Sequence, residues 1–201
     1  MKKIDRPRST VKRRDTLKAI LGIGLGLPLA KRVASNEAAM NTPPQVDDVF
    51  VFAFGEREGE RIGPDDLSTD ARQIFAYPMD PATGVIRNGS RLNQVLLLRI
   101  DPTRLSERMR SRSVDGIVAY SAVCTHTGCD VADWDAETLR FQCPCHDSQF
   151  DPADGARVVG GPAPRPLASL PLKSENEVLT AAGGFDGPVG FQQPGLDPFG
   201  F

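Results

Sequence analysis

All the cysteines and histidines of this 201-residue chain lie within residues 124–151. They form two short groups, Cys124-Thr-His126 with Cys129 after it, and Cys143-Pro-Cys145-His146. Each group places a thiol and an imidazole on one loop, and a predicted hairpin over residues 134–143 would bring the two loops face to face. Both side-chain types bind transition metals as thiolate and neutral imidazole. The stretch therefore predicts a centre with two cysteine and two histidine ligands, and it leaves two cysteines over.

Other uses of these residues also have to be weighed. A zinc finger has cysteine pairs separate from a histidine pair, whereas cysteine and histidine alternate here. Two disulfides would suit an exported protein and allow three connectivities, but they leave the histidines without a role. A Cys-x-x-Cys redox motif is absent, because only one residue separates Cys143 from Cys145. A [2Fe-2S] centre with thiolates on one iron and imidazoles on the other uses both residue types, and a non-redox zinc or disulfide module is the alternative.

The two groups resemble the Rieske family, in the CTHxGC and CPCHxSxFD form of respiratory proteins. The resemblance covers about residues 119–168. It implies an all-β fold, a Rieske-type antiparallel β sandwich with a small cluster-binding subdomain and one short helix. One [2Fe-2S] cluster would be the cofactor, with Cys124 and Cys143 on its inner iron and His126 and His146 on the solvent-facing iron.

The same resemblance assigns roles to nearby residues. Cys129 and Cys145 stand where respiratory members have a disulfide between the two loops, a bond that needs an oxidising compartment. Ser148 and Phe150 occupy positions that tune the reduction potential, where relatives often have serine and tyrosine hydroxyls bonded to cluster sulfur. Because Phe150 cannot donate, we expect a potential below that of a tyrosine-bearing relative. The segment 160–164 resembles a loop that shields the cluster, with Gly161, Pro162 and Pro164 as its characteristic residues.

Residues 1–35 resemble a twin-arginine export signal, with ten Lys or Arg against two Asp and an apolar run after Arg13-Arg14. Thr16 stands where that pattern usually has Phe. The apolar residues 19–30 would span about 18 Å as a helix, against about 30 Å of hydrocarbon. Residues 33–35, Val-Ala-Ser, have the small side chains that a signal peptidase requires at its cleavage site. We expect export to the periplasmic side of the cytoplasmic membrane, with removal of the signal slightly favoured over an N-terminal anchor.

The rest of the chain is acidic. Without residues 1–35 it keeps 14 of the 24 Lys or Arg and 24 of the 26 Asp or Glu. This balance argues against nucleic acid as a partner. It suits docking to a basic partner such as a soluble c-type cytochrome, and a role in solubility explains it equally well.

The sequence predicts a linker over 36–48, the Rieske domain over 49–182 and a Gly/Pro-rich tail over 183–201 that either packs on a partner or lacks order. Residues 102–113 after the candidate N-cap Asp101 predict a helix, with Arg104, Arg108 and Arg112 on a solvent-facing side. Apolar and β-branched runs predict strands at 49–54, 73–77, 94–100, 117–123, 139–143 and 158–159, and a last hairpin of 170–172 and 177–180 through residues 174–176.

The predicted centre has no nucleophile, no general base and no open metal position, so it moves single electrons and is not a stand-alone enzyme. We expect an exported electron-transfer subunit of a respiratory oxidoreductase, which passes electrons from quinol or a catalytic partner subunit to a c-type cytochrome. The Gly-Pro-Ala-Pro loop favours cytochrome b of a bc-type complex as the partner. The short apolar run and Phe150 favour a molybdopterin oxidoreductase subunit, as in enzymes resembling arsenite oxidase. The sequence leaves both partners open.

Overall fold

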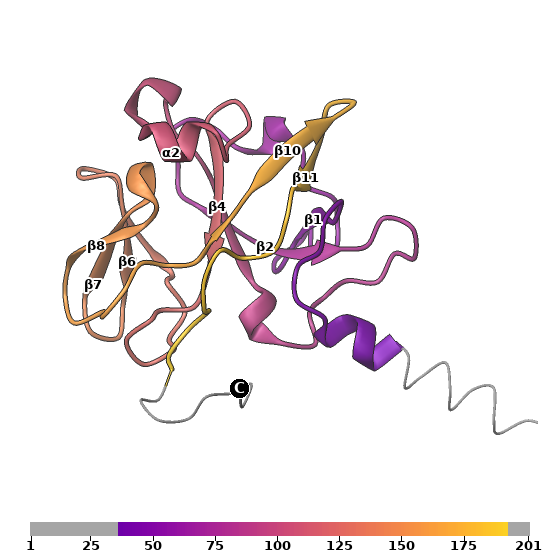
Figure 1. Ribbon diagram of the computed structural model, residues 1–201, viewed down its shortest axis with the longest axis horizontal. Coiled ribbons are helices and arrows are strands. Elements are labelled where there is room, and N and C mark those ends of the chain that lie inside the picture. The colour runs from indigo at the N-terminus through magenta and orange to yellow at the C-terminus, as the bar shows by residue number, and fades with distance from the viewer. Residues whose placement is uncertain (1–35, 193–201) are drawn as a thin grey trace, which may run out of the picture. The chain divides into compact units, whose positions relative to one another are not determined.

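The computed structural model describes residues 36–192 (Figure 1). The predicted signal, residues 1–35, and the end of the predicted tail, residues 193–201, lie outside the described residues. None of the helices within residues 36–192 has the length and apolar character that a membrane span requires. Within the described residues, helix covers residues 36–41, η1 Pro64–Asp66, η2 Arg91–Asn93, η3 Pro102–Arg104, α2 Glu107–Arg110 and η4 Pro152–Asp154.

Two antiparallel sheets form the fold, which confirms the predicted all-β class. The larger sheet has the strand order β10-β11-β1-β2-β3-β4-β9, and the smaller one β5-β6-β7-β8. The strands of the larger sheet are β1 Val49–Phe52, β2 Ile74–Met79, β3 Val95–Arg99, β4 Ile117–Ser121, β9 Ser169–Leu170, β10 Leu172–Glu175 and β11 Val178–Ala181. Those of the smaller sheet are β5 Asp133–Asp135, β6 Arg140–Cys143, β7 Ser148–Asp151 and β8 Arg157–Gly160.

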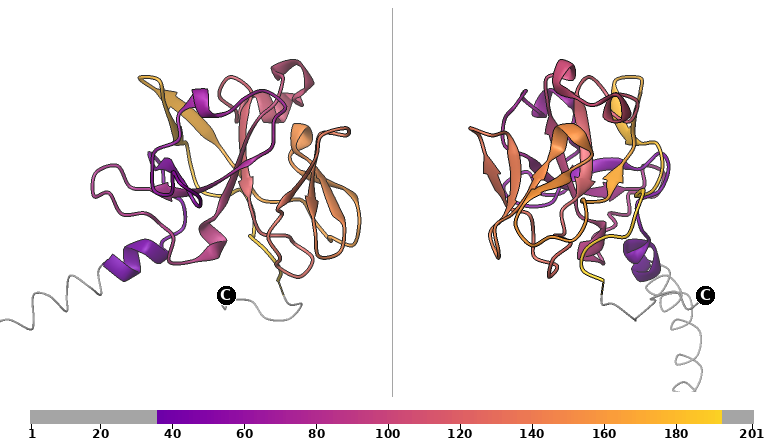
Figure 2. Two further views of the ribbon diagram at one scale, coloured as in Figure 1. Left: turned by 180° about the vertical axis from the view of Figure 1, so that it is seen from behind. Right: turned by 60° about the vertical axis from the view of Figure 1, so that its left-hand side comes forward.

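The smaller sheet is an insertion between β4 and β9, two strands that are neighbours in the larger sheet. In Figures 1 and 2 it forms a separate layer beside β4. This topology matches the predicted cluster-binding subdomain inserted into a base of antiparallel strands. The end of β4 and the hairpins of the smaller sheet therefore meet at one place.

The position of β3 between two cores explains why its sequence is continuously apolar. Successive side chains of a strand point to opposite faces, and β3 has a buried core on each face. Leu96 and Leu98 pack toward the smaller sheet, with Phe141 and Phe150, while Val95 and Leu97 pack into the other core. A strand that is covered on both faces shows no polar alternation.

Tyr120 fixes the smaller sheet to the larger one. Its ring is fully buried and lies edge-on to Phe141, with ring centroids 5.9 Å apart. Its hydroxyl donates a 2.7 Å hydrogen bond to the carbonyl of Pro152, just after β7. Burial raises the pKa of Tyr120 far above its ordinary value, so the hydroxyl remains a donor.

The predicted helix over residues 102–113 is wrong in its extent. The structure has η3, which Asp101 caps by accepting from the amide of Thr103 at 2.9 Å, and then the single-turn α2. Leu105 between them is extended and buried in the core, which interrupts the helix. Arg112 does not share a solvated face, because its Nε donates to the Ser169 hydroxyl at 3.0 Å.

The predicted linker and the last turn also differ from the structure. Residues 36–41 are helical, and Asp48 is buried and accepts hydrogen bonds of 2.6 and 2.8 Å from Arg87. A buried carboxylate requires such a partner, so the second half of the linker is part of the folded domain. Strand β10 extends to Glu175, so the last hairpin turns at Asn176 and Glu177 and not over residues 174–176. Both turn residues have a positive φ.

Residues 183–192 of the predicted tail form no helix or strand, yet they pack on the domain. Asp186 accepts a 2.7 Å hydrogen bond from the Ser169 amide and forms ion pairs with Arg108 and Arg112. These contacts hold the segment against β9 and α2, so the folded part of the chain continues past residue 182.

Candidate metal centre

The first group of candidate ligands begins at Cys124, three residues after the end of β4. Cys124 is fully buried, its amide donates to the carbonyl of Cys129 at 2.8 Å, and its carbonyl accepts from the amide of Gly128 at 3.0 Å. These bonds close residues 124–129 into a tight loop. His126 is half-buried on this loop, so the thiol faces the core and the imidazole lies nearer the surface.

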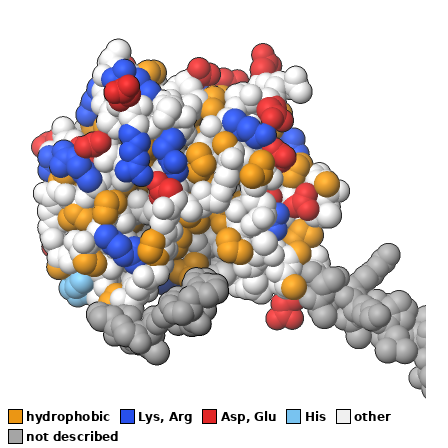
Figure 3. Space-filling model, viewed as in Figure 1, with side chains coloured by type: hydrophobic (Ala, Val, Ile, Leu, Met, Phe, Trp, Pro, Cys, Tyr) orange, Lys and Arg blue, Asp and Glu red, His pale blue; other side chains and the backbone are white. Residues whose placement is uncertain are grey.

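The second group lies on the turn between β6 and β7. Cys143 is the last residue of β6 and is 1% exposed. Its carbonyl accepts from the amide of Asp147 at 3.0 Å, and Asp147 has a positive φ. His146 is exposed at the outer end of this turn, and histidine atoms are visible at the surface in Figure 3. This group therefore repeats the arrangement of the first, with a buried thiol and an outer imidazole.

The fold brings the predicted ligands together in two pairs, the two thiols and the two imidazoles. The rings of His126 and His146 are 4.6 Å apart between centroids and almost perpendicular. Burial raises the pKa of the Cys143 thiol to about 11, and hydrogen bonding to Cys124 adds to this shift. The Nδ1 atom of His126 is buried without a hydrogen-bond partner among residues 36–192. Two adjacent buried thiols and an unpartnered imidazole nitrogen fit a metal centre, since a bound cation stabilises thiolates and occupies such a nitrogen.

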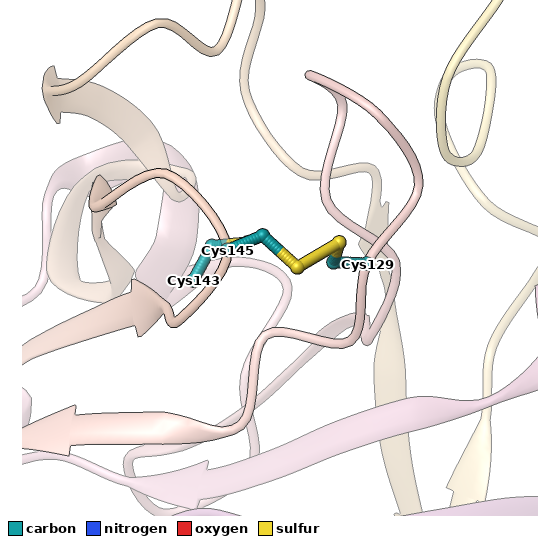
Figure 4. Close-up of side chains that lie close together, drawn as sticks. All are labelled: Cys129, Cys143 and Cys145. Atoms are coloured by element: carbon teal, nitrogen blue, oxygen red, sulfur yellow. A yellow bond between two sulfur atoms is a disulfide. The ribbon is translucent and has the colours of Figure 1, made fainter.

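A disulfide joins Cys129 to Cys145 and ties the two loops (Figure 4). This is the pairing that the resemblance implies. The sulfur of Cys143 lies close by, and the three sulfurs are within 4.8 Å of one another. Two of them are committed to the disulfide, so this trio cannot supply three thiolates. Cys124 and Cys143 are the free cysteines.

Ser148 and Phe150, the predicted tuning residues, both point inward from β7 and are fully buried. The Ser148 hydroxyl accepts a 3.1 Å hydrogen bond from the amide of Ala163, which leaves its hydrogen free to donate elsewhere. Phe150 lies in the core that joins the two sheets. The structure therefore places both on the inner face of the second group, and their tuning role stays a prediction.

The predicted shielding loop, residues 160–164, connects both groups. Ala163 is bonded to Ser148 beside the second group, and the carbonyl of Arg165 accepts from the Thr125 hydroxyl of the first at 2.7 Å. Pro162 and Pro164 are exposed on its outer side. Gly161 has a φ of +76°, and a Cβ there would lie 2.5 Å from the Cα of Ser148. Only glycine allows this approach of the two backbones.

We expect Gly161→Ala to destabilise the folded state by about 2 kcal/mol, because the added methyl group must push two backbone segments apart. The measurement is the free energy of unfolding in denaturant. Gly84→Ala is the matched control, since Gly84 also has a positive φ, +70°, but a Cβ there meets nothing within 4 Å. Equal losses in the two variants would mean that strain in φ, and not the close approach, requires glycine at position 161.

Sequence reasoning missed two supports of the first loop. Arg91 donates to the carbonyl of Gly128 at 2.7 Å and forms an ion pair with Asp130. Thr125 binds the residue after the shielding loop. Thr125 lies inside the motif, so its position next to the ligands could be read from the sequence. Arg91 lies far from the loop in sequence, and no local pattern indicates its contact.

Comparisons with known proteins agree with this geometry. The sequence pattern of the Rieske [2Fe-2S] domain matches residues 103–171. A Haloferax mediterranei protein named as the Rieske subunit of a respiratory nitrate reductase is 35% identical over 199 residues, which cover 94% of this chain and 84% of that protein. The cytochrome bc1 complex Rieske iron-sulfur subunit of Streptomyces lividans is 42% identical over 98 residues, 48% of this chain and 58% of that one.

Similar solved structures include a plasma membrane Rieske protein of Synechocystis PCC 6803, with 23% identity, a TM-score of 0.35 and coverage of 54% of this chain and 84% of that one. Another is the soluble domain of Rieske protein II from Sulfolobus acidocaldarius, with 20% identity, a TM-score of 0.35 and coverage of 80% and 79%.

Proposed function

Because this chain belongs to the Rieske [2Fe-2S] family and carries one such cluster, we propose that it is an exported electron-transfer subunit of a respiratory complex of the nitrate reductase kind. When bound, the cluster supplies a one-electron redox centre. The observation that carries the proposal is the pair of loops that brings two buried thiols and two outer imidazoles together, with a disulfide between the loops.

We assign the ligands by burial. Cys124 and Cys143 would hold the inner iron, because their thiols are buried against the core. His126 and His146 would hold the outer iron, because their rings lie nearer the surface. The unpartnered Nδ1 of His126 supports this assignment.

The protein groups around the centre suit electron transfer. Buried apolar residues exclude water on the thiol side, and the shielding loop covers another side through its bonds to Ser148 and Thr125. His146 is left exposed, so a partner protein or a quinol hydroxyl can reach its ring. We therefore infer that partner subunits carry out the substrate chemistry.

The extent of the sequence likeness favours one partner. Similarity to the Haloferax protein covers nearly the whole chain, including residues outside the Rieske pattern, whereas that to the Streptomyces protein covers about half. We propose a molybdopterin oxidoreductase subunit as the partner, with quinol as the electron source and a c-type cytochrome as a further acceptor. The second candidate is cytochrome b of a bc-type complex, which the shielding loop favours.

The twin-arginine pattern of residues 1–35 supports export to the periplasmic side of the membrane. The Cys129–Cys145 disulfide supports it independently, because such bonds persist in oxidising compartments.

Affinity purification of the tagged full-length chain from gently solubilised membranes of its own host tests the function. We expect a molybdopterin subunit in the purified material, identified by mass spectrometry, and a cluster signal in electron paramagnetic resonance after addition of a quinol. Recovery with cytochrome b instead would establish the second candidate. A colourless, zinc-containing protein would contradict electron transfer altogether.

Ser148→Ala should lower the reduction potential, because the reduced cluster loses a hydrogen bond to sulfur. If about 1 kcal/mol of that bond favours the reduced state, the shift is about 40 mV for one electron. Phe150→Tyr should raise the potential by tens of millivolts. Protein-film voltammetry measures both, with Gln149→Met as the control because Gln149 lies on the other face of β7. No shift, or shifts of opposite sign, would show that these two side chains do not face the cluster.

A further inference from the structure

The segment of residues 186–191 crosses the base of the first ligand loop. Gly190 is buried, and with its φ of +68° a Cβ there would lie 2.9 Å from Cγ1 of Val123, the residue before Cys124. At the tip of the loop, a Cβ on Gly128 would lie 3.8 Å from the Cβ of Phe191. The segment therefore touches the ligand loop at its entry and at its tip.

Arg165 holds the part of this segment that lies nearest the ligand loop. Its Nη1 donates to the carbonyl of Pro188 at 2.8 Å, and its Nη2 donates to the carbonyl of Gly190. Its own carbonyl accepts the 2.7 Å bond from Thr125, which lies between the candidate ligands Cys124 and His126. Arg165 thus connects the shielding loop, the first ligand loop and the C-terminal segment.

The charge of Arg165 has no counterion within residues 36–192. No carboxylate of the described chain lies within ion-pair distance of it, and its side-chain partners are carbonyls. A cavity of about 180 Å³ beside it is also lined by Arg108 and Asp186, and Asp186 is already paired with Arg108 and Arg112. Basic side chains also gather on the face in Figure 3 that carries α2 and β8. The surroundings therefore leave a net positive charge here.

We propose that Arg165 is a positioning residue of the metal centre, which ties the C-terminal segment across the first ligand loop and places there an uncompensated positive charge that raises the reduction potential. The inference rests on the ligand assignment of the proposed function. The reduced centre carries one more negative charge than the oxidised one, so a nearby cation favours reduction. Salt screens a partly buried charge less than an exposed one.

Three variants of the full-length, cluster-loaded protein test the two roles of Arg165 separately, its charge and its attachment of the C-terminal segment to the ligand loop. Arg165→Gln removes the charge, and we expect the equilibrium between oxidised and reduced protein to shift severalfold toward the oxidised form in voltammetry. A tenfold change would be about 59 mV. Arg165→Lys keeps the charge, so its potential should stay near that of the wild type. A single ammonium cannot match the two-pronged guanidinium, so this variant should lose its cluster faster on warming.

Arg157→Gln is the matched control, because Arg157 lies in the same subdomain but is exposed and paired with Asp151 and Asp154. Its potential should equal that of the wild type. The charge effect is refuted if Arg165→Gln shifts the potential no more than this control, or if Arg165→Lys shifts it as much as Arg165→Gln. If Arg165→Gln does not fold, Arg165→Lys tests the positioning role by itself. A wild-type cluster lifetime in Arg165→Lys would then refute the role of Arg165 in fixing the C-terminal segment across the ligand loop. A wild-type protein without a cluster would refute the proposed function, whereas an unchanged potential refutes only this inference.

Discussion

Serine at position 124 or 143 should yield protein without the [2Fe-2S] cluster, and so should alanine at position 126 or 146. Each iron has only two protein ligands in the Rieske arrangement, so every one of these changes removes half of an iron's protein coordination. We expect complete loss of the cluster, measured as the absence of the visible absorption and of the electron paramagnetic resonance signal after reduction. A full cluster signal in any of the four variants would overturn the ligand assignment.

The matched control for the cysteine variants is the double substitution of Cys129 and Cys145 by Ser. It removes two sulfur atoms from the same loops, and both of them lie within 4.8 Å of the Cys143 sulfur. We expect this double variant to assemble the cluster, because the two substituted cysteines form a disulfide with each other in the structure and are not predicted ligands. The two sets of variants together identify which two of the four cysteines bind iron.

Local patterns predicted most of the strands, because burial leaves a clear signal in them, but they did not predict β7. The apolar residues of β3 and the hairpin of β5 and β6 follow from composition and from period-2 geometry. The predicted helix over residues 102–113 failed because its polar and apolar spacing is compatible with a helix, while the burial of Leu105 and Met109 fixes two shorter turns instead. Tertiary packing overrides local propensity in such segments.

The ligand groups were predictable because all their residues lie in two short motifs. The residues that support them were not. Arg91 reaches Gly128 and Arg165 reaches Gly190 across many intervening residues, and no local pattern records such contacts. The Gly/Pro content of the tail predicted packing on a partner or a lack of order, whereas residues 183–192 pack on the domain itself. It could not show that Gly190 is used for close packing on Val123.

The Cys129→Ser/Cys145→Ser protein should assemble a cluster and then lose it much faster than the wild type. The bonded cysteines are 16 positions apart, and closing a loop of about this size stabilises the folded state by about 3 kcal/mol. Since about 1.4 kcal/mol corresponds to a factor of ten, the open form of the two loops should become up to about 100-fold more populated. Bleaching of the visible spectrum on warming measures the cluster lifetime.

Wild-type protein treated with a thiol reductant provides the second arm of this experiment. Cys145 is exposed, so a reductant can reach the bond, and the treated protein should bleach at the rate of the double variant. Free thiols at both positions in protein recovered from the periplasm would contradict the pairing. A double variant that never assembles a cluster would mean that these cysteines bind iron. An unchanged lifetime would mean that the contacts of the shielding loop with Ser148 and Thr125 suffice to hold the two ligand loops together.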